Sequence, residues 1–389
     1  MSLGWSDAWR EVLQTALRLV PWPTEPGLRK AGDPGPESPV VITGNYDLTV
    51  RRLMRALRGV DAWVVVAASG GINVWCAASG GHLTTHQVVA ALKTCGVEQR
   101  VRHRRAVLPQ LAATGVIGRE VSRRCGWKVR FGPVRADDLP EYFAHQDEKT
   151  EAMRRVRFGV VERLEMACVW AAPSALLLAA ASAPFRPAWS LPLAGGSFAL
   201  SVALFLGYDR IPAPRRTLFA AAAAVLAAAC VSLAGGGTPA LVTGVAASLV
   251  LAGVLTYDYS GSTPIEGGSH FEERRWHVVL DAERCDGVFS CWEVCPEACF
   301  EKRYDPRRVE IARAERCVRC GACVVQCPKD ALAFSDGDGR RIEPDVIRRF
   351  KLNLLGQRTV ASPPPSPLVD SPPLASTSVT SGSEEAGTR

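Results

Sequence analysis

The chain lacks the patterns that would assign it to several large functional classes. No G-x-G-x-x-G run opens a helix and no G-x-x-x-x-G-K-[ST] run is present, so a nucleotide site is not supported. Lysine and arginine (46) exceed aspartate and glutamate (39) only modestly, and no basic stripe alternates with aromatic residues. We therefore expect no nucleic-acid partner. Residues 1–20 also lack the apolar core of a signal peptide, because charges interrupt them. Those charged residues are Asp7, Arg10, Glu11 and Arg18.

The first part of the chain, residues 1–162, alternates short apolar runs with helical patterns. Thr84 and Gln87 have the spacing of a capping box and predict the start of a helix. Alternation of strands and helices predicts an α/β domain with a mostly parallel sheet. The expected strands lie at 40–42, 63–66 and 129–131, and the expected helices at 48–57 and 84–94.

The middle of the chain, residues 163–258, is almost free of charge. Residues 166–185, 187–208 and 217–257 contain no charged side chain. A membrane span needs about 20 apolar residues, so this region predicts a bundle of four transmembrane helices. Buried helices of a soluble protein are the alternative, which three successive charge-free stretches disfavour. The expected spans are about 166–185, 188–208, 217–234 and 239–257.

Arginines predict the orientation of these spans. The first connection holds only Arg186, and the third holds none. The positive-inside rule then predicts a multi-pass protein of the cytoplasmic membrane, with both termini in the cytoplasm. The arginines that decide this are Arg154, Arg155, Arg157 and Arg163 before the spans, Arg210, Arg215 and Arg216 in the second connection, and Arg274 and Arg275 after them.

Near the C-terminus, four cysteines and a proline follow the pattern C-x2-C-x2-C-x3-C-P. The run comprises Cys317, Cys320, Cys323, Cys327 and Pro328. This spacing is typical of bacterial-type ferredoxins, where three thiolates hold one cluster and the fourth reaches a second cluster. Structural zinc, the alternative, usually takes two separated C-x2-C pairs. The run predicts electron transfer by a dicluster ferredoxin-like α+β domain at residues 276–356.

A second cysteine run lies upstream and is incomplete. Cys291 and Cys295, followed by proline, occupy the third and fourth ligand positions after Cys285. The second position is Val288, whose apolar side chain cannot bind iron. Cys299 could supply the missing ligand, but a free thiol near a cluster is the favoured reading.

The C-x5-C-x3-C-P pattern resembles that of seven-iron ferredoxins, which carry one 3Fe–4S and one 4Fe–4S cluster. The resemblance implies that Cys285, Cys291 and Cys327 hold the three-iron cluster. It assigns the 4Fe–4S cluster to Cys295, Cys317, Cys320 and Cys323. A second 4Fe–4S cluster remains open for the site that lacks a ligand.

The other five of the thirteen cysteines have no disulfide-framework spacing. Thiolates that must stay reduced favour the cytoplasm. Residues 259–275 are expected to be a linker, and the Ser/Pro/Thr-rich residues 357–389 a disordered tail. The five cysteines are Cys76, Cys95, Cys125, Cys168 and Cys230.

The segment around Cys76 reads Asn73-Val74-Trp75-Cys76-Ala77-Ala78. A lone cysteine among apolar residues is usually a small buried hydrophobe. However, this segment resembles the signature of mercury-methylating corrinoid proteins. Residues 21–355 together resemble a fusion of that family with its dicluster ferredoxin partner. Other segments that resemble the family are 38–46, 103–104, 108–111, 132–140 and 261–264.

The resemblance implies a cobalamin-type corrinoid bound against the α/β domain, with Cys76 as the lower axial cobalt ligand. Asn73, Val74, Trp75, Ala77 and Ala78 would surround it, together with Gly132, Pro133 and Val134. A soft thiolate suits a transition metal and would favour departure of a methyl group toward an electrophile such as mercury(II). Reloading requires a low-potential electron, which iron–sulfur clusters can supply.

Two departures from the family leave the methyl acceptor open. Ser79 and Gly80 stand where the family has glycine and lysine, and no cysteine follows Cys327. The favoured interpretation is a membrane-anchored corrinoid-dependent methyltransferase with a fused iron–sulfur reductase, which methylates mercury(II) or another acceptor. Its partners would be a methyl-donor protein or small molecule and an electron donor. The alternative is a membrane-anchored electron-transfer protein whose first domain binds a corrinoid or a partner without methyl transfer.

Overall fold

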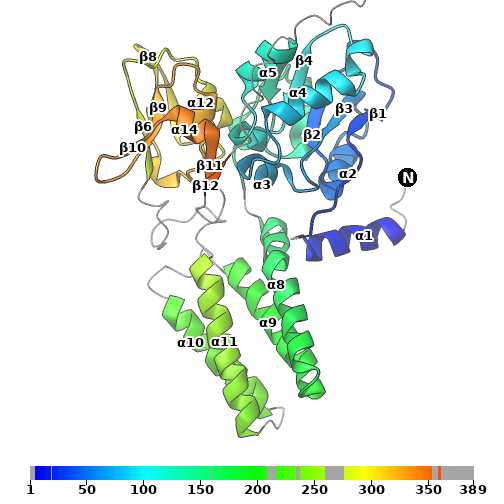
Figure 1. Ribbon diagram of the computed structural model, residues 1–389, viewed down its shortest axis with the longest axis vertical. Coiled ribbons are helices and arrows are strands. Elements are labelled where there is room, and N and C mark those ends of the chain that lie inside the picture. Colours follow the sequence, from blue (N-terminus) through cyan, green and yellow to red (C-terminus); the bar gives the residue numbers. More distant parts are fainter. Residues whose placement is uncertain are drawn as a thin grey trace, which may run out of the picture.

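The computed structural model describes residues 5–18, 20–157, 159–207, 216–233, 237–258, 276–352 and 358–360. An α/β domain and a smaller C-terminal domain lie side by side, and four helices extend away from both (Figure 1). Several predicted features lie outside the described residues: Arg210 and Arg215 in the second connection, the linker at 259–275 with Arg274 and Arg275, and the tail from 361 onward.

The α/β domain contains a five-stranded sheet in the order β1-β3-β2-β4-β5. The strands β2, β3, β4 and β5 are parallel, and only β1 is antiparallel to its neighbour. The predicted mostly parallel sheet is confirmed. The two strands that the sequence analysis missed, β1 and β4, are short and contain arginines. The bounds are β1 Gly27–Ala31, β2 Val40–Gly44, β3 Ala62–Ala67, β4 Arg105–Leu108 and β5 Lys128–Phe131.

Helices cover both faces of this sheet. Successive residues of β3 alternate between two apolar clusters, one under α3, α4 and α5 and the other under α2 and α6, as the period of two in a strand requires. The capping box of Thr84 and Gln87 is present at the start of α4. The helices are α1 Trp5–Ala16, α2 Asp47–Ala56, α3 Val74–Ser79, α4 Thr85–Thr94, α5 Gly118–Cys125, α6 Leu139–Ala144 and α7 Glu151–Arg154, with short 3-10 turns η1 Val97–Gln99, η2 Gln110–Thr114 and η3 Ala136–Asp138.

Four long helices follow the α/β domain: α8 Val160–Ser182, α9 Pro187–Gly207, α10 Arg216–Leu233 and α11 Thr238–Asp258. In the described part of the chain, only α8 and α9 are long and apolar enough to cross a membrane. Within the described residues, the apolar segments found in α10 and α11 are shorter, at Ala220–Ala229 and Thr238–Val250. Two of the four expected spans therefore coincide with helices of sufficient length and apolar composition. The first of these helices, α8, begins at Val160, before the expected start of the span at about 166.

The C-terminal domain consists of small sheets around two short helices, α12 and α13, which pack against each other. The strands form a sheet in the order β10-β9-β6, a β7–β8 hairpin and a β11–β12 pair. The last strand, β12, pairs with β11. It lies inside residues 357–389, the segment predicted to be a disordered tail. The bounds are β6 His277–Leu280, α12 Ser290–Val294, β7 Phe300–Tyr304, β8 Arg307–Ile311, η7 Ala314–Arg316, α13 Ala322–Gln326, β9 Leu332–Ser335, β10 Arg341–Ile342, α14 Pro344–Arg349, β11 Phe350–Leu352 and β12 Arg358–Val360.

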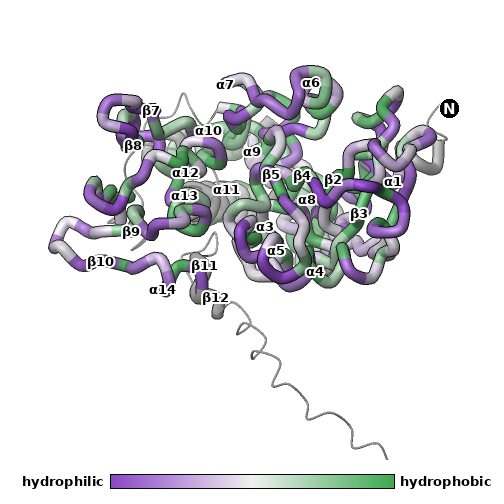
Figure 2. Tube along the Cα trace, turned by 90° about the horizontal axis from the view of Figure 1, so that it is seen from above, coloured by the Kyte–Doolittle hydropathy of each residue, from purple (hydrophilic) through white to green (hydrophobic). Residues whose placement is uncertain are grey.

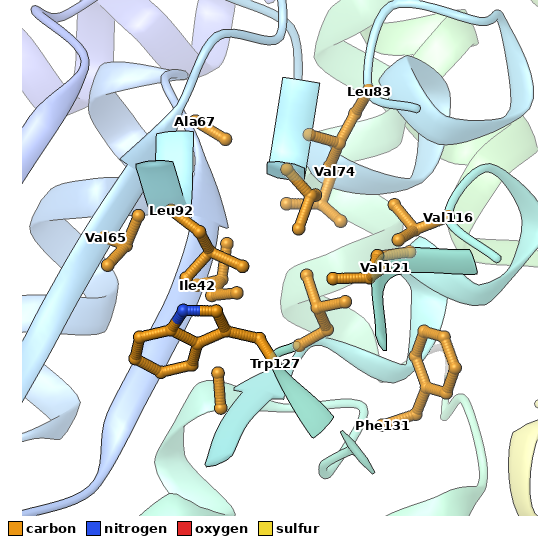
Figure 3. Packing of buried hydrophobic residues seen from close by; sticks show 14 of the residues in the cluster. Ile42, Val65, Ala67, Val74, Leu83, Leu92, Val116, Val121, Trp127 and Phe131 are labelled. Carbon is orange, nitrogen blue, oxygen red and sulfur yellow. The ribbon is translucent and has the colours of Figure 1, made fainter. Parts of the chain in front are cut away.

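The core of the α/β domain is built around Trp127, which precedes β5. Its side chain is completely buried and lies among Ile42, Val65 and Leu92 (Figure 3). The indole Nε1 donates a hydrogen bond to Glu98 Oε1 at 2.9 Å. A large apolar ring is thus buried while its one polar atom keeps a partner.

We expect Trp127→Ala to lower the free energy of unfolding of the α/β domain by about 3–5 kcal/mol, because it leaves a large cavity. Trp127→Phe should lower the free energy of unfolding less than Trp127→Ala does. Phenylalanine keeps a large buried ring and loses the hydrogen bond to Glu98. Urea denaturation followed by circular dichroism measures both. The control is Arg123→Ala, whose side chain is 77% exposed; an equal loss in that variant would contradict the prediction.

Candidate functional site

A cavity of about 360 Å³ lies at the carboxyl ends of the parallel strands. Thr43 of β2, Pro109 after β4 and Gly132 after β5 form its wall on the sheet side. Open α/β sheets bind ligands at this edge, and the volume is in the range of small-molecule and cofactor sites.

Cys76 lies in this wall, in the first turn of α3. Asn73 caps the helix: its Oδ1 accepts a hydrogen bond from the Cys76 backbone N–H at 3.0 Å. The Nδ2 of the same amide donates to Cys76 Sγ at 3.2 Å. One side chain therefore fixes both the backbone and the sulfur of Cys76. The thiol is half-buried and faces the cavity rather than the apolar core.

Most of the predicted cofactor shell lines the cavity, but two residues do not. Ala77 and Ala78 are fully buried and are absent from the cavity wall. They lie on the side of α3 that packs against η2, because one face of a six-residue helix cannot present all of its residues to a ligand. The predicted residues that line the cavity are Asn73, Val74, Trp75, Cys76, Gly132, Pro133 and Val134.

Asn45 holds the loop that leads from β3 into α3. Its buried Oδ1 accepts hydrogen bonds from the backbone N–H groups of Ser69 at 2.7 Å and Gly71 at 3.0 Å. Gly71 has φ +69°, and a Cβ there would lie 2.6 Å from Pro23 N. Only glycine fits this turn. The sequence analysis gave Asn45 no role, since its partners are more than twenty residues away.

The opposite wall of the cavity is charged and involves α8. Glu165 accepts hydrogen bonds from Arg18 at 2.8 Å and Arg52 at 2.6 Å. Glu162 pairs with Arg135 at 2.6 Å. These ion pairs join the first turns of α8 to the α/β domain. They connect residues distant in sequence, so no local pattern predicts them.

In the C-terminal domain, five cysteines surround a second cavity. The predicted ligands of the four-iron cluster lie there, and Cys299 joins them. Cys299 therefore lies with the predicted ligands of the four-iron cluster and not with those of the other cluster, where Val288 leaves a ligand missing. The five are Cys295, Cys299, Cys317, Cys320 and Cys323. The convergence of several thiols at one cavity fits the donor set of an iron–sulfur cluster.

The remaining three predicted ligands form a separate group. Burial raises the pKa of the Cys291 thiol to about 12, and the neighbouring sulfurs of Cys327 and Cys285 add to this effect. Val288, in the same loop, is 52% exposed.

The two cysteine runs repeat the same backbone turns. In one run, Val288 precedes Phe289, whose φ is positive; in the other, Cys320 precedes Gly321, whose φ is also positive. Val288 therefore occupies the backbone position that the predicted ligand Cys320 occupies in the other run. The backbone N–H of Cys299 donates to Cys295 Sγ at 3.3 Å, and the N–H of Ala331 donates to Cys327 Sγ at 3.3 Å. Cys299 is therefore the counterpart of Ala331. This explains why its thiol lies at the four-iron site.

The C-terminal domain docks on η2 of the α/β domain. η2 contacts α3, which carries Cys76, and also α13, which carries Cys323; the two domains adjoin there in both views (Figures 1 and 2). Gln326 at the end of α13 makes the central contact. Its Nε2 donates to the carbonyls of Ala113 at 2.7 Å and Val116 at 2.6 Å, and its Oε1 accepts from Gly118 N at 3.2 Å.

A second contact surrounds Trp292. Its indole ring lies between the Arg154 guanidinium of the α/β domain at 3.5 Å and the Lys302 ammonium of its own domain at 3.6 Å. Nearby, Lys149 Nζ donates to the Glu293 carbonyl at 2.9 Å. Lys149 is half-buried, and burial lowers its pKa to about 8.

Ser79 lies between the two sites. It lines the large cavity and also a smaller cavity formed with Thr114, Arg319 and Cys320. Ser79 thus lines both the cavity that contains Cys76 and the smaller cavity that contains Cys320.

Comparison with known proteins divides the chain in the same way. Residues 7–143 match the family described as CO dehydrogenase/acetyl-CoA synthase delta subunit. Residues 312–333 match the 4Fe-4S binding domain. A domain similar to the delta-subunit family is joined here to a ferredoxin-type domain. The matches do not single out the mercury-methylating proteins that the sequence resembles.

Gamma subunits of the acetyl-CoA decarbonylase/synthase complex are also similar to the first domain. The subunit of Archaeoglobus fulgidus is 36% identical over 117 residues, which is 30% of this chain and 24% of the relative. The subunit of Methanopyrus kandleri is 34% identical over 124 residues, 31% of this chain and 26% of the relative. The chain thus spans about a quarter of the length of these relatives.

We expect Gln326→Ala to weaken the docking of the two domains by about 1–3 kcal/mol, because two carbonyls lose their donor at a buried contact. Amide exchange at Gly118 and the preceding turn should accelerate, by about tenfold for each 1.4 kcal/mol. Hydrogen–deuterium exchange of the full chain measures this. Gln99→Ala, an exposed substitution in the same protein, is the control. Unchanged exchange at Gly118 would contradict the prediction.

Proposed function

We propose that the chain is a membrane-anchored corrinoid protein that transfers methyl groups and receives electrons from its own iron–sulfur domain. One observation carries the proposal: Cys76 faces a cofactor-sized cavity, and Ser79 in the lining of that cavity also lines a small cavity with Cys320 of the C-terminal domain. The similarity of residues 7–143 to the delta-subunit family supports it.

The residues around the large cavity fit a corrinoid. The wall on the sheet side is mostly apolar and offers one soft ligand, the sulfur of Cys76, as a transition metal prefers. When bound, the corrinoid supplies a cobalt centre that accepts a methyl group from a donor and passes it to an acceptor.

Asn73 is a positioning residue for this ligand. Its Nδ2–H donates a hydrogen bond to Cys76 Sγ, and its Oδ1 at the same time holds the first turn of α3. The sulfur is thereby held toward the cavity before any cofactor binds.

Electron delivery uses the contact between the domains. Cys320, a proposed ligand of the four-iron cluster, lies with Ser79 and Thr114 around the small cavity. Ser79 Oγ and Thr114 Oγ1 are 3.5 Å apart. The donor is thus held beside the acceptor within one chain, so no diffusional encounter is required.

We further propose one 4Fe–4S and one 3Fe–4S cluster. The repeated backbone turns support this assignment, because they give Val288 the position that Cys320 holds in the other run. Cys299 does not replace the missing ligand, since its thiol lies at the four-iron cavity.

Membrane anchoring rests on α8 and α9 in the first place. Large apolar side chains on these helices point outward, such as Leu176 and Leu177 of α8 and Leu191 of α9. An exposed apolar surface of this kind suits lipid. The proposed orientation keeps both soluble domains in the cytoplasm, with the iron–sulfur clusters on the reducing side.

Mercury(II) is the first acceptor to test, because the segment at 73–78 resembles that of mercury-methylating proteins. The gamma subunits that are similar to the first domain are named as subunits of an acetyl-CoA decarbonylase/synthase complex. A methyl-donor protein is therefore proposed as a partner of this chain, with a small-molecule donor as the alternative.

Cys76→Ala tests the ligand assignment in anaerobically purified, corrinoid-loaded protein. We expect loss of the thiolate-type cobalt absorption band and of methyl transfer to mercury(II), because alanine has no donor atom. The iron and sulfide content should stay unchanged. If the spectrum and the transfer persist, Cys76 is a structural cysteine and not the cobalt ligand. Absence of methyl transfer in the wild-type protein as well would favour the alternative, an electron-transfer protein without methyltransferase activity.

Asn73→Asp is the matched variant for the role of the amide. Aspartate still caps a helix but cannot donate to the sulfur. We therefore expect the corrinoid-loaded variant to keep α3 but to show a weaker cobalt–sulfur absorption band than the wild type, because the amide no longer holds the sulfur toward the cavity. An unchanged band would contradict the positioning role of Asn73.

Electron paramagnetic resonance of the oxidised protein should show a three-iron signal. We expect Val288→Cys to remove it by converting that cluster to the four-iron form, because the new thiol occupies a ligand position. Cys299→Ala should leave the signal unchanged. A wild-type protein without the signal, in which Cys299→Ala destroys a second four-iron cluster, would show that Cys299 is the missing ligand.

A further inference from the structure

The helix α1 is amphipathic with its polar side turned toward the protein. Glu11 bonds Arg55 at 2.7 Å and Arg52 at 3.3 Å. Gln14 donates to Asp47 at 2.8 Å, and Arg10 pairs with the same carboxylate at 3.3 Å. Surface helices of soluble proteins normally bury the apolar side instead.

The apolar side of α1 is open. Trp9 is 65% exposed, Val12 58% and Leu13 48%. Their spacing of three and four residues puts them on one face of the helix. Each of these three side chains thus keeps about half or more of its surface accessible.

The position of α1 indicates what covers it. α1 contacts α8 and lies crosswise to it at its first turns (Figure 1). Arg18, just after α1, is bonded to Glu165, the last charged residue before the apolar part of α8. On the same turns of α8, Val160 and Val161 are each 65% exposed. A helix at this level that runs across a spanning helix lies along the membrane surface.

We infer that α1 is an interfacial helix whose apolar face is inserted into the bilayer surface. The inference rests on the proposed membrane anchoring by α8. It fits the properties of such helices, which bury apolar side chains at the headgroup boundary, and tryptophan is favoured at this depth. α1 contacts α8 at the level of the exposed Val160 and Val161, so one bilayer would cover both helices.

The consequence is a fixed position for the large cavity. Arg52 and Glu165 line the cavity and also bind α1 or its flanking Arg18. With α1 on the surface and α8 across the bilayer, the charged wall of the cavity lies close to the headgroups. The α/β domain is then held at two points and cannot pivot about a single helix.

Photocrosslinking in the full chain tests the inference. p-Benzoylphenylalanine replaces Trp9, Leu13 or Arg10 in separate variants, which are reconstituted into vesicles of phosphatidylethanolamine and phosphatidylglycerol. After irradiation, mass spectrometry detects lipid adducts. We expect lipid adducts in the variants at positions 9 and 13 and no adduct in the variant at position 10. Arg10 is the matched control, because it is 55% exposed on the polar side of the same helix.

Two further positions separate the possible failures. Leu177 on α8 is 70% exposed and should form lipid adducts, whereas Tyr304 on β7 is 73% exposed and should not. Adducts at 177 without adducts at 9 and 13 would overturn the interfacial helix alone. Absence at 177 as well would overturn the membrane anchoring. A chain–chain adduct at position 13 would assign the apolar face to a second copy and also reject the inference.

Discussion

The docking of the C-terminal domain on η2 is the contact on which the rest of the arrangement depends. η2 touches the helix of Cys76 on one side and the helix of Cys323 on the other. Gln326 satisfies the carbonyl of Ala113 in η2 and the carbonyl of Val116 and the N–H of Gly118 just after it. This docking brings Ser79 and Cys320 to the lining of one small cavity. The relative position of the two sites thus depends on contacts between the domains and not only on the helices that connect them along the chain.

The large cavity is a meeting point of three parts of the chain. The sheet edge supplies the wall with Gly132, α3 supplies Cys76, and α8 supplies the charged wall with Glu165. The ion pairs of Glu165 hold α8 against the α/β domain. Part-buried pairs of this kind are costly to break, because a charge would be left without its partner. The same residues therefore close the cavity and fix the domain relative to the helices.

Local patterns predicted the elements well where the signal was strong. The buried strands β2 and β3 and the capping box of Thr84 were found, because apolar runs and capping residues act over a few positions. The strands β1 and β4 were missed, since arginines dilute their apolar character. Ala77 and Ala78 were assigned to the cofactor shell with their neighbours, yet α3 turns them toward η2. The position of Cys299 could not be read from the sequence either, because it follows from the repeated turns of the two cysteine runs.

The sequence by itself determined which residues are proposed to carry the chemistry. Cysteine spacing defined the two cysteine runs, and a six-residue segment marked Cys76, because ligand type and spacing are local properties. Only the tertiary structure decided how these residues are used together. It joined Asn45 to the loop before Cys76, Glu165 to Arg18 and Arg52, and Gln326 to Ala113 and Val116. These partners are separated by many residues, and hydrogen bonds and charges act through distance in space, not through position along the chain.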